Sequence, residues 1–269
     1  MTKRANSSLA TANPPLLCEP QEKRRIELKN IDLAYSYVLG FFGPDIEQAS
    51  PCTDGMIRYL HKIVIDGIYG CGGNYRDVVH PVIISGASFV PVHASQVEFE
   101  VAELIQRIRG WDRDNPNLVT RIHLAAESFH QFNKIHPFRG GNGRVSRLLL
   151  HLMLYEMKVL EPPEQLFEYI VHRRQAYLRA LASADDGSFD EIHRFMVRGI
   201  FDLRLNVLLT LLSRNDMMGR LKRILKDRAI RRFLTDTENR YRISDSQFHL
   251  YRREVYNAVV KLTIEQYGS

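Results

Sequence analysis

The sequence predicts a mostly α-helical bundle with one small β-hairpin and a helical C-terminal extension. Apolar residues recur at helical spacing in successive segments of the chain. Only residues 77–92 combine a run of β-branched side chains with a glycine turn, the pattern of two short strands joined as a hairpin. Pairs such as Asn115-Pro116 and Pro162-Pro163 separate the helical segments, because proline cannot continue a helix.

The N-terminal elements follow from their residue patterns. Residues 1–25 contain Ser, Thr, Asn and Pro and are expected to be extended, and helical periodicity then begins near Ile26. A second helix is expected over residues 56–68, where apolar side chains form one stripe. The glycines of residues 67–73 require a loop after it.

The remaining elements follow the hairpin. Helices are expected over residues 96–111 and 118–134, and another follows the loop at 136–147 and ends near Met157. The last helices before the extension are expected over residues 163–184 and 189–213, divided by the sequence Asp-Asp-Gly-Ser at 185–188. The parts are therefore an N-terminal segment and helix at 1–49, a core at 50–212 and the extension at 213–269.

The composition is that of a soluble globular protein, with 45% hydrophobic and 25% charged residues among 269. Three cysteines without metal-ligand spacing argue against a disulfide framework and favour a reducing, cytoplasmic location. Residues 1–20 lack the continuous apolar core of a signal peptide, and no apolar run reaches the ~20 residues of a membrane span. We therefore expect no association with a membrane.

Positive charge is concentrated in the C-terminal extension. Residues 214–253 hold twelve Lys and Arg residues against five Asp and Glu, and the rest of the chain is close to neutral. Such a segment can contact nucleic acid, an acidic protein or lipid headgroups, but a solvated helix face is the better explanation. No specific nucleic-acid motif accompanies it. Nucleic acid therefore remains a lesser alternative among the expected partners.

The loop at residues 136–147 has the sequence His-Pro-Phe-Arg-Gly-Gly-Asn-Gly-Arg-Val-Ser-Arg, followed by an apolar helix. Backbone N–H groups and the helix dipole at such a position can hold an anion. Glycines allow the backbone to approach phosphates closely, and the guanidinium groups of Arg144 and Arg147 suit phosphate oxygens. Each feature alone is commonly structural, but together they predict phosphate chemistry with a histidine beside it.

This loop resembles the signature of the Fic (Fido) family, His-x-Phe-x-[Asp/Glu]-Gly-Asn-Gly-Arg-x-x-Arg. Every defining position matches except Gly140, which replaces the acidic residue. The resemblance extends to Leu60-His61 with the segment 72–76, to a flap at Val82–Val92 and to the helices around the loop, over roughly residues 50–212. It implies a Fic-type helical bundle with a β-hairpin flap.

The resemblance also implies an activity, the transfer of AMP from ATP to a Ser, Thr or Tyr hydroxyl of a protein. His136 would be the general base and Phe138 a buried structural anchor. The groups expected to bind the nucleotide phosphates are Gly141, Asn142, Gly143, Arg144 and Arg147. The flap at 82–92 would dock a target protein by adding it as a strand, and modification of the chain itself is a further option.

Gly140 leaves the metal question open, because the family's acidic residue coordinates Mg²⁺ on the nucleotide. Without that ligand, Mg²⁺ would be held by ATP and water, or Arg139 would replace part of its charge. The alternative is a degenerate member that binds nucleotide as a regulatory protein with weak or no transfer. The intact Gly-Asn-Gly-Arg segment favours AMP transfer over phosphorylation, and transfer of another phosphate-linked group remains open.

Overall fold

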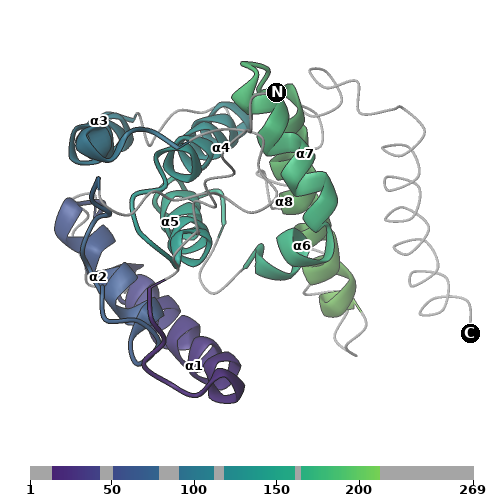
Figure 1. Cartoon of the computed structure of the whole chain (residues 1–269). Helices are drawn as coiled ribbons and strands as arrows, with labels where there is room; N and C mark the ends of the chain where they lie inside the picture. The colour runs from purple at the N-terminus through teal and green to yellow at the C-terminus, as the bar shows by residue number, and fades with distance from the viewer. Residues whose placement is uncertain (1–13, 43–50, 79–90, 112–117, 161–164, 213–269) are drawn as a thin grey trace, which may run out of the picture. The chain divides into compact units, whose positions relative to one another are not determined.

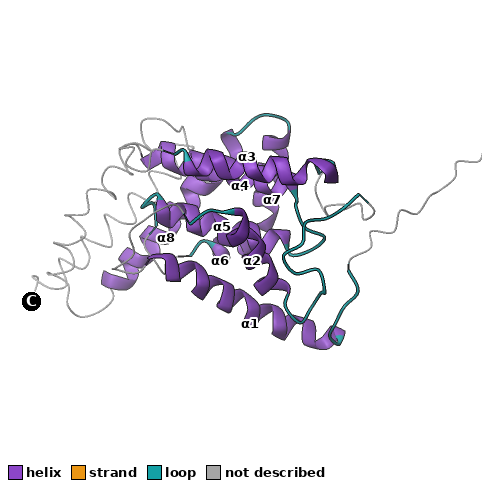
Figure 2. Cartoon of the chain, turned by 90° about the vertical axis from the view of Figure 1, so that its left-hand side faces the viewer, coloured by secondary structure: helices purple, strands orange, loops and turns teal. Residues whose placement is uncertain are grey.

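The computed structural model describes residues 14–42, 51–78, 91–111, 118–160 and 165–212, and these ranges are mostly helical (Figure 1). Within them, β-pairing is limited to an isolated antiparallel bridge between Leu16 and Tyr69 (Figure 2). The helical prediction is confirmed. The hairpin expected at 77–92 lies mainly at residues 79–90, outside the described residues, as does the extension at 213–269.

The helices of the described ranges are α1 (Pro20–Leu39), η1 (Gly40–Phe42), α2 (Asp54–Ile65), η2 (Ala94–Gln96), α3 (Val97–Arg109), α4 (Leu118–Ile135), α5 (Asn142–Glu156), α6 (Phe167–His172), α7 (Arg174–Asp185) and α8 (Asp190–Leu212). The chain divides into two compact units. One contains residues 1–111 and 128–153, and the other contains residues 112–127 and 154–269. The 136–147 loop therefore belongs entirely to the first unit.

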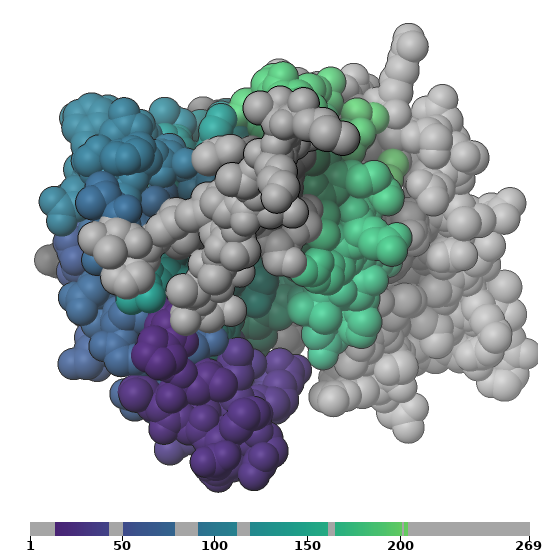
Figure 3. Space-filling model, in the orientation of Figure 1, coloured from purple at the N-terminus to yellow at the C-terminus, as the bar shows by residue number. Residues whose placement is uncertain are grey.

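In the first unit, α2 lies between α1 and α3 (Figures 1 and 3). Helix α2 begins at Thr53, whose side chain accepts a hydrogen bond from the Met56 amide and so satisfies one free N–H of the first turn. Its apolar stripe includes Ile57, Leu60 and Val64, which are fully buried. Because these residues recur every three or four positions, burial of one face fixes the rotation of α2 about its axis.

In the second unit, α6 packs on α7 and α7 packs along α8. The single helix expected over 163–184 is wrong, because the backbone of Arg173 is non-helical (φ −110°, ψ 32°) and separates α6 from α7. The Arg173 guanidinium lies over the Tyr169 ring at 4.3 Å and pairs with Asp202 of α8 at 3.2 Å. The Arg173 amide still donates to the Tyr169 carbonyl at 3.2 Å, and the Arg173 carbonyl accepts from the Tyr177 amide at 2.9 Å.

Helix boundaries differ from the sequence expectations at two places in the first unit. Helix α1 begins at Pro20 rather than near Ile26, because proline is well accommodated in the first turn of a helix. Helix α5 begins at Asn142, inside the 136–147 loop. Its first turn therefore contains Asn142, Gly143 and Arg144, three of the residues expected to bind phosphates, and Gly141 precedes it. Among the described residues, no helix combines the length and apolar character needed to cross a membrane.

Candidate active site

His136 lies at the C-terminal end of α4, where the chain turns into the loop. Its amide donates to the Phe132 carbonyl at 3.0 Å, and its backbone adopts a left-handed φ of 49°. A residue with a side chain adopts this conformation only when its surroundings hold it there. The position of His136 is therefore imposed by tertiary contacts.

The buried side chain of Arg76 supplies those contacts. Its Nε donates to the His136 carbonyl at 2.8 Å, and its Nη2 donates to the Ile135 carbonyl at 3.1 Å and to the Val92 carbonyl. The Arg76 amide donates to the Pro137 carbonyl at 2.8 Å. A cation at the last carbonyls of a helix also interacts favourably with the helix dipole. Arg76 thus holds the start of the loop against the end of α4.

The His136 ring is arranged as a proton acceptor. Its Nδ1 lies 3.3 Å from the Asn133 carbonyl oxygen. Because a carbonyl only accepts, Nδ1 carries the proton in this contact and Nε2 keeps its lone pair. Burial is the largest cause lowering the pKa of His136 to about 4, and the Arg76 charge lowers it further against the opposing bond to Asn133. The imidazole is therefore neutral at physiological pH.

Asn142 closes the loop on itself. Its Oδ1 accepts from the Phe138 amide at 2.9 Å, and its Nδ2 donates to the Phe138 carbonyl at 2.7 Å. The Asn142 side chain is buried and both ends of its amide are used, so the structure gives this group a role within the loop instead of toward a phosphate. Asn142 can still offer its backbone N–H, which lies in the first turn of α5.

Phe138 and His61 stack at the centre of the loop. Phe138 is fully buried, and its ring lies 3.7 Å from the ring of His61 with an interplanar angle of 12°. The His61 Nδ1 accepts from the Gly73 amide at 3.0 Å, so its Nε2 carries the proton and donates to the Gly140 carbonyl at 3.0 Å. Burial is the largest cause lowering the pKa of His61 to about 4. A neutral imidazole thus connects residue 73 to the loop.

Gly141 is required by the backbone. Its φ is 79°, and a Cβ there would lie 2.8 Å from Cγ2 of Ile65. Only glycine adopts this conformation at low cost and allows the loop to approach α2 so closely. The first N–H groups of the following turn, those of Asn142 and Gly143, have no intrahelical partner, and N–H groups in this position can bind an anion.

The two arginines of the loop make different contacts. Arg144 Nη1 donates to the Val64 carbonyl at 2.8 Å and lies 3.5 Å from Oε1 of Glu27 in α1, so the structure ties it to α1 and α2. Arg147 lies alongside the first turn, with Nη1 3.5 Å from the position of a Cβ on Gly143. Arg147 thus lies beside Gly143, and contact of either arginine with phosphate remains a prediction.

The position of Gly140 does not fit a protein-bound Mg²⁺. Magnesium in nucleotide sites is held by carboxylates together with the phosphates, and Gly140 has no such donor. A Cβ on Gly140 would meet the Tyr69 ring at 3.6 Å. Throughout the described ranges, no group of three or more His, Cys, Asp and Glu side chains is arranged to hold a metal ion. The Mg²⁺ expected from the resemblance therefore has no ligand at this position.

Three residues of the site were not given a role from the sequence. Arg76 and His61 belong to the upstream segments of the resemblance, and Glu27 lies in α1. Their bonds to the loop span 79 positions for His61 and 60 positions for Arg76, so no local pattern reveals the contact. One signal can be read in the sequence. His61 lies on the apolar stripe of the second helix, and a polar residue that is buried there needs hydrogen-bond partners.

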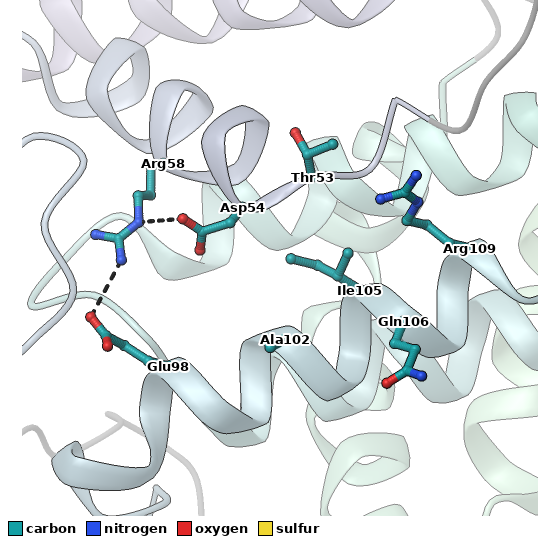
Figure 4. A pocket seen from close by; sticks show the side chains of 8 residues that line it. All are labelled: Thr53, Asp54, Arg58, Glu98, Ala102, Ile105, Gln106 and Arg109. Carbon is teal, nitrogen blue, oxygen red and sulfur yellow. Dashed lines mark hydrogen bonds and ion pairs between the residues drawn. The ribbon is translucent and has the colours of Figure 1, made fainter.

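A separate hollow of about 610 Å³ lies between α2 and α3 (Figure 4). Arg58 joins its two walls, with contacts to Asp54 at 2.7 Å and Glu98 at 3.5 Å. Its lining residues are Thr53, Asp54, Arg58, Glu98, Ala102, Ile105, Gln106 and Arg109. None of them belongs to residues 136–147, so this hollow is not part of the loop site.

The structure combines a helical core with a glycine-containing loop that begins a helix beside a neutral histidine, and such a loop can hold an anion. Residues 51–154 match the model of the Fic/DOC family, which confirms the resemblance seen in the sequence and shows that the chain contains a Fic domain.

Curated relatives carry the name protein adenylyltransferase Fic. The protein from Drosophila grimshawi is 28% identical over 172 residues, which cover 63% of this chain and 32% of the relative. The protein from Drosophila melanogaster is 27% identical over the same length and coverage. The matching region thus spans about a third of these relatives' own length. The activity of the whole protein therefore remains a matter for proposal.

Solved structures show the same fold. A Fic family protein from Desulfovibrio desulfuricans superposes with a TM-score of 0.58 at 23% identity, covering 78% of this chain and 60% of that one. Fic-1 from C. elegans gives a TM-score of 0.58 at 19% identity, covering 73% of this chain and 56% of that one. At these identities the likeness establishes the fold alone.

Proposed function

We propose that this chain transfers AMP from ATP to a hydroxyl side chain of a protein. The observation that carries the proposal is the state of His136, whose Nδ1 bonds the Asn133 carbonyl and whose Nε2 is an unprotonated acceptor at neutral pH. This acceptor lies at the entrance to a loop that leads into the free N–H groups of α5. Curated relatives named as adenylyltransferases support the same reaction class.

In this reaction, His136 Nε2 takes the proton of a target hydroxyl as its oxygen attacks the α-phosphorus of ATP. The new oxygen–phosphorus bond forms while the bond from the α-phosphorus to the pyrophosphate oxygen breaks, and pyrophosphate leaves. The first-turn N–H groups of α5 and the Arg147 guanidinium would offset the charge on the phosphate chain. His136 then releases the proton to solvent and returns to its neutral form.

The expected partner is a protein whose segment docks at the flap, Val82–Val92. Residues 91 and 92 are described, and the Val92 carbonyl is bonded to Arg76, which also holds the His136 carbonyl. One side chain therefore links the end of the flap to the proposed base. This link supports docking of the target close to His136.

Intact-protein mass spectrometry tests the proposal. The chain is incubated with ATP and Mg²⁺, alone and with candidate target proteins, beside His136→Ala and His172→Ala. His172 lies at the end of α6 in the second unit and serves as a matched control. An AMP adduct that His136→Ala abolishes and His172→Ala preserves is expected. An adduct of equal yield with His136→Ala would refute the assignment of the base.

A second candidate is nucleotide binding without transfer, and the observation that favours it is Gly140. The loop retains its anion-binding turn but lacks the acidic side chain. A chain that binds ATP, forms no adduct with any protein and gains transfer in Gly140→Asp would be a regulatory module of this kind. An adduct on the unaltered chain excludes it.

A further inference from the structure

Tyr69 occupies the space beside Gly140. It follows α2 and is held by the antiparallel bridge to Leu16, where the Leu17 amide donates to the Ile68 carbonyl at 2.9 Å. The Tyr69 side chain is only 8% exposed, and its Cε2 is the nearest atom to the direction in which a Gly140 side chain would extend. Backbone pairing thus fixes an aromatic ring next to the position of the missing acid.

Lys23 of α1 places a positive charge at the Tyr69 hydroxyl. Its Nζ lies 3.0 Å from the Tyr69 hydroxyl oxygen. An ammonium group has no lone pair, so Lys23 donates and the hydroxyl accepts, which leaves the hydroxyl proton available. Within the described parts of the chain, Tyr69 has no acceptor for that proton. A buried hydroxyl polarised by a cation is a strong donor, and a phosphate oxygen is the acceptor that suits it best.

The charges at this position match those of the family arrangement. A carboxylate with its Mg²⁺ contributes one net positive charge beside the phosphates. Gly140 contributes none, and the Lys23 ammonium supplies one positive charge through its bond to Tyr69. Lys23 can thus supply the positive charge that the metal and its acid would contribute, in addition to that of the neighbouring Arg139, without a metal ligand.

We propose that this chain binds the polyphosphate of a nucleotide without a protein-bound divalent cation, and that the Lys23–Tyr69 pair takes the place of the metal and its acid. This inference rests on the proposed function, because it assumes that the loop binds a nucleoside triphosphate. The Tyr69 hydroxyl donates to a phosphate oxygen, and Lys23 neutralises part of the phosphate charge. Bound nucleotide is therefore held by protein donors on both sides of Gly140.

Calorimetric titration of the full chain with ATP, in EDTA and in Mg²⁺, tests the inference. The Kd in EDTA is expected to stay within about threefold of the Kd in Mg²⁺, because no protein ligand for the metal is present. Tyr69→Phe keeps the ring but removes the donor, and Lys23→Met removes the charge. Each is expected to weaken binding in EDTA by about tenfold, the usual effect of losing a charge-assisted hydrogen bond.

Two controls make the result specific. Lys29→Met removes an exposed charge from the same helix and is expected to leave the Kd unchanged. Gly140→Asp is expected to bind weakly in EDTA, because its carboxylate repels the phosphates, and to recover in Mg²⁺. The melting temperature of each variant shows that altered binding does not come from unfolding.

The outcomes separate this inference from the proposed function. Loss of native binding in EDTA, native-like affinity of both Tyr69→Phe and Lys23→Met, or absence of ATP binding in both buffers would overturn it. Metal-independent binding without an AMP adduct would support the inference and remove the transferase proposal. An AMP adduct formed by a chain that binds ATP only in Mg²⁺ would support the transferase proposal and overturn this inference.

Discussion

Replacement of Gly141 by alanine should destabilise the first unit far more than the same change at its neighbour. The Gly141 φ of 79° requires the left-handed region, which costs an alanine about 1–2 kcal/mol. The new Cβ would lie 2.8 Å from Ile65 Cγ2, and such overpacking costs a further ~1–3 kcal/mol. The free energy of unfolding should therefore fall by about 2–5 kcal/mol.

Gly140→Ala is the matched control. Gly140 is not among the glycines with positive φ, and its Cβ would meet Tyr69 at an ordinary contact distance of 3.6 Å. The unfolding free energy should change by less than about 1 kcal/mol. Urea denaturation followed by circular dichroism measures both variants against the unaltered chain. Equal midpoints for the two variants would refute the conformational argument.

A double mutant separates the two causes. Ile65→Ala removes the Cγ2 atom that a Cβ on Gly141 would strike. Combined with Gly141→Ala, it should show a favourable coupling energy of about 1–3 kcal/mol, because the steric part is relieved while the backbone part remains. Strict additivity of the two changes would show that the close approach of the loop to α2 contributes nothing.

Three further outcomes are expected. The pKa of His61 is lowered to about 4, so the stability it contributes is complete above the unfolded pKa near 6.5 and is lost as pH falls toward 4. His61→Gln should reduce the dependence of the melting temperature on pH across that window, although His136 keeps its own contribution there, and an unchanged slope would contradict the neutral assignment. Asn142→Ala removes both hydrogen bonds to Phe138 and should lower the free energy of unfolding in urea by about 2 kcal/mol. A change below about 0.5 kcal/mol would show that these two hydrogen bonds are redundant. Arg76→Lys cannot donate along the same fork and should reduce AMP transfer measured by mass spectrometry, with native yield as the opposing result.

The helical class and most helix positions could be predicted from the sequence because apolar spacing determines which face of a helix is buried. The stripe with Ile57, Leu60 and Val64 is an example, since all three are fully buried. The break at Arg173 could not be predicted, because nothing local ends the helix there. At this position Arg173 pairs with Asp202 of α8, a contact that exists only after the helices have packed.

The site could be predicted in part for a similar reason. The loop at 136–147 is contiguous, so its residue types indicate anion binding directly. The role of the Asn142 side chain could not be inferred from the sequence. An asparagine at this position could donate to a phosphate or bond the backbone of its own loop, and the sequence is the same in both cases. The ties from Arg76, His61 and Glu27 to the loop come from other segments, and their geometry is set by the packing of α1 and α2.

Gly140 has an ordinary backbone, and a Cβ there would meet Tyr69 at an ordinary contact distance, which has a genetic consequence. Every glycine codon becomes an aspartate or glutamate codon through a change in its second base, so an acidic side chain is one point mutation away. The fold would accept the first atom of that side chain without displacing Tyr69. Neither the genetic code nor the backbone of the loop therefore opposes an acidic residue at this position.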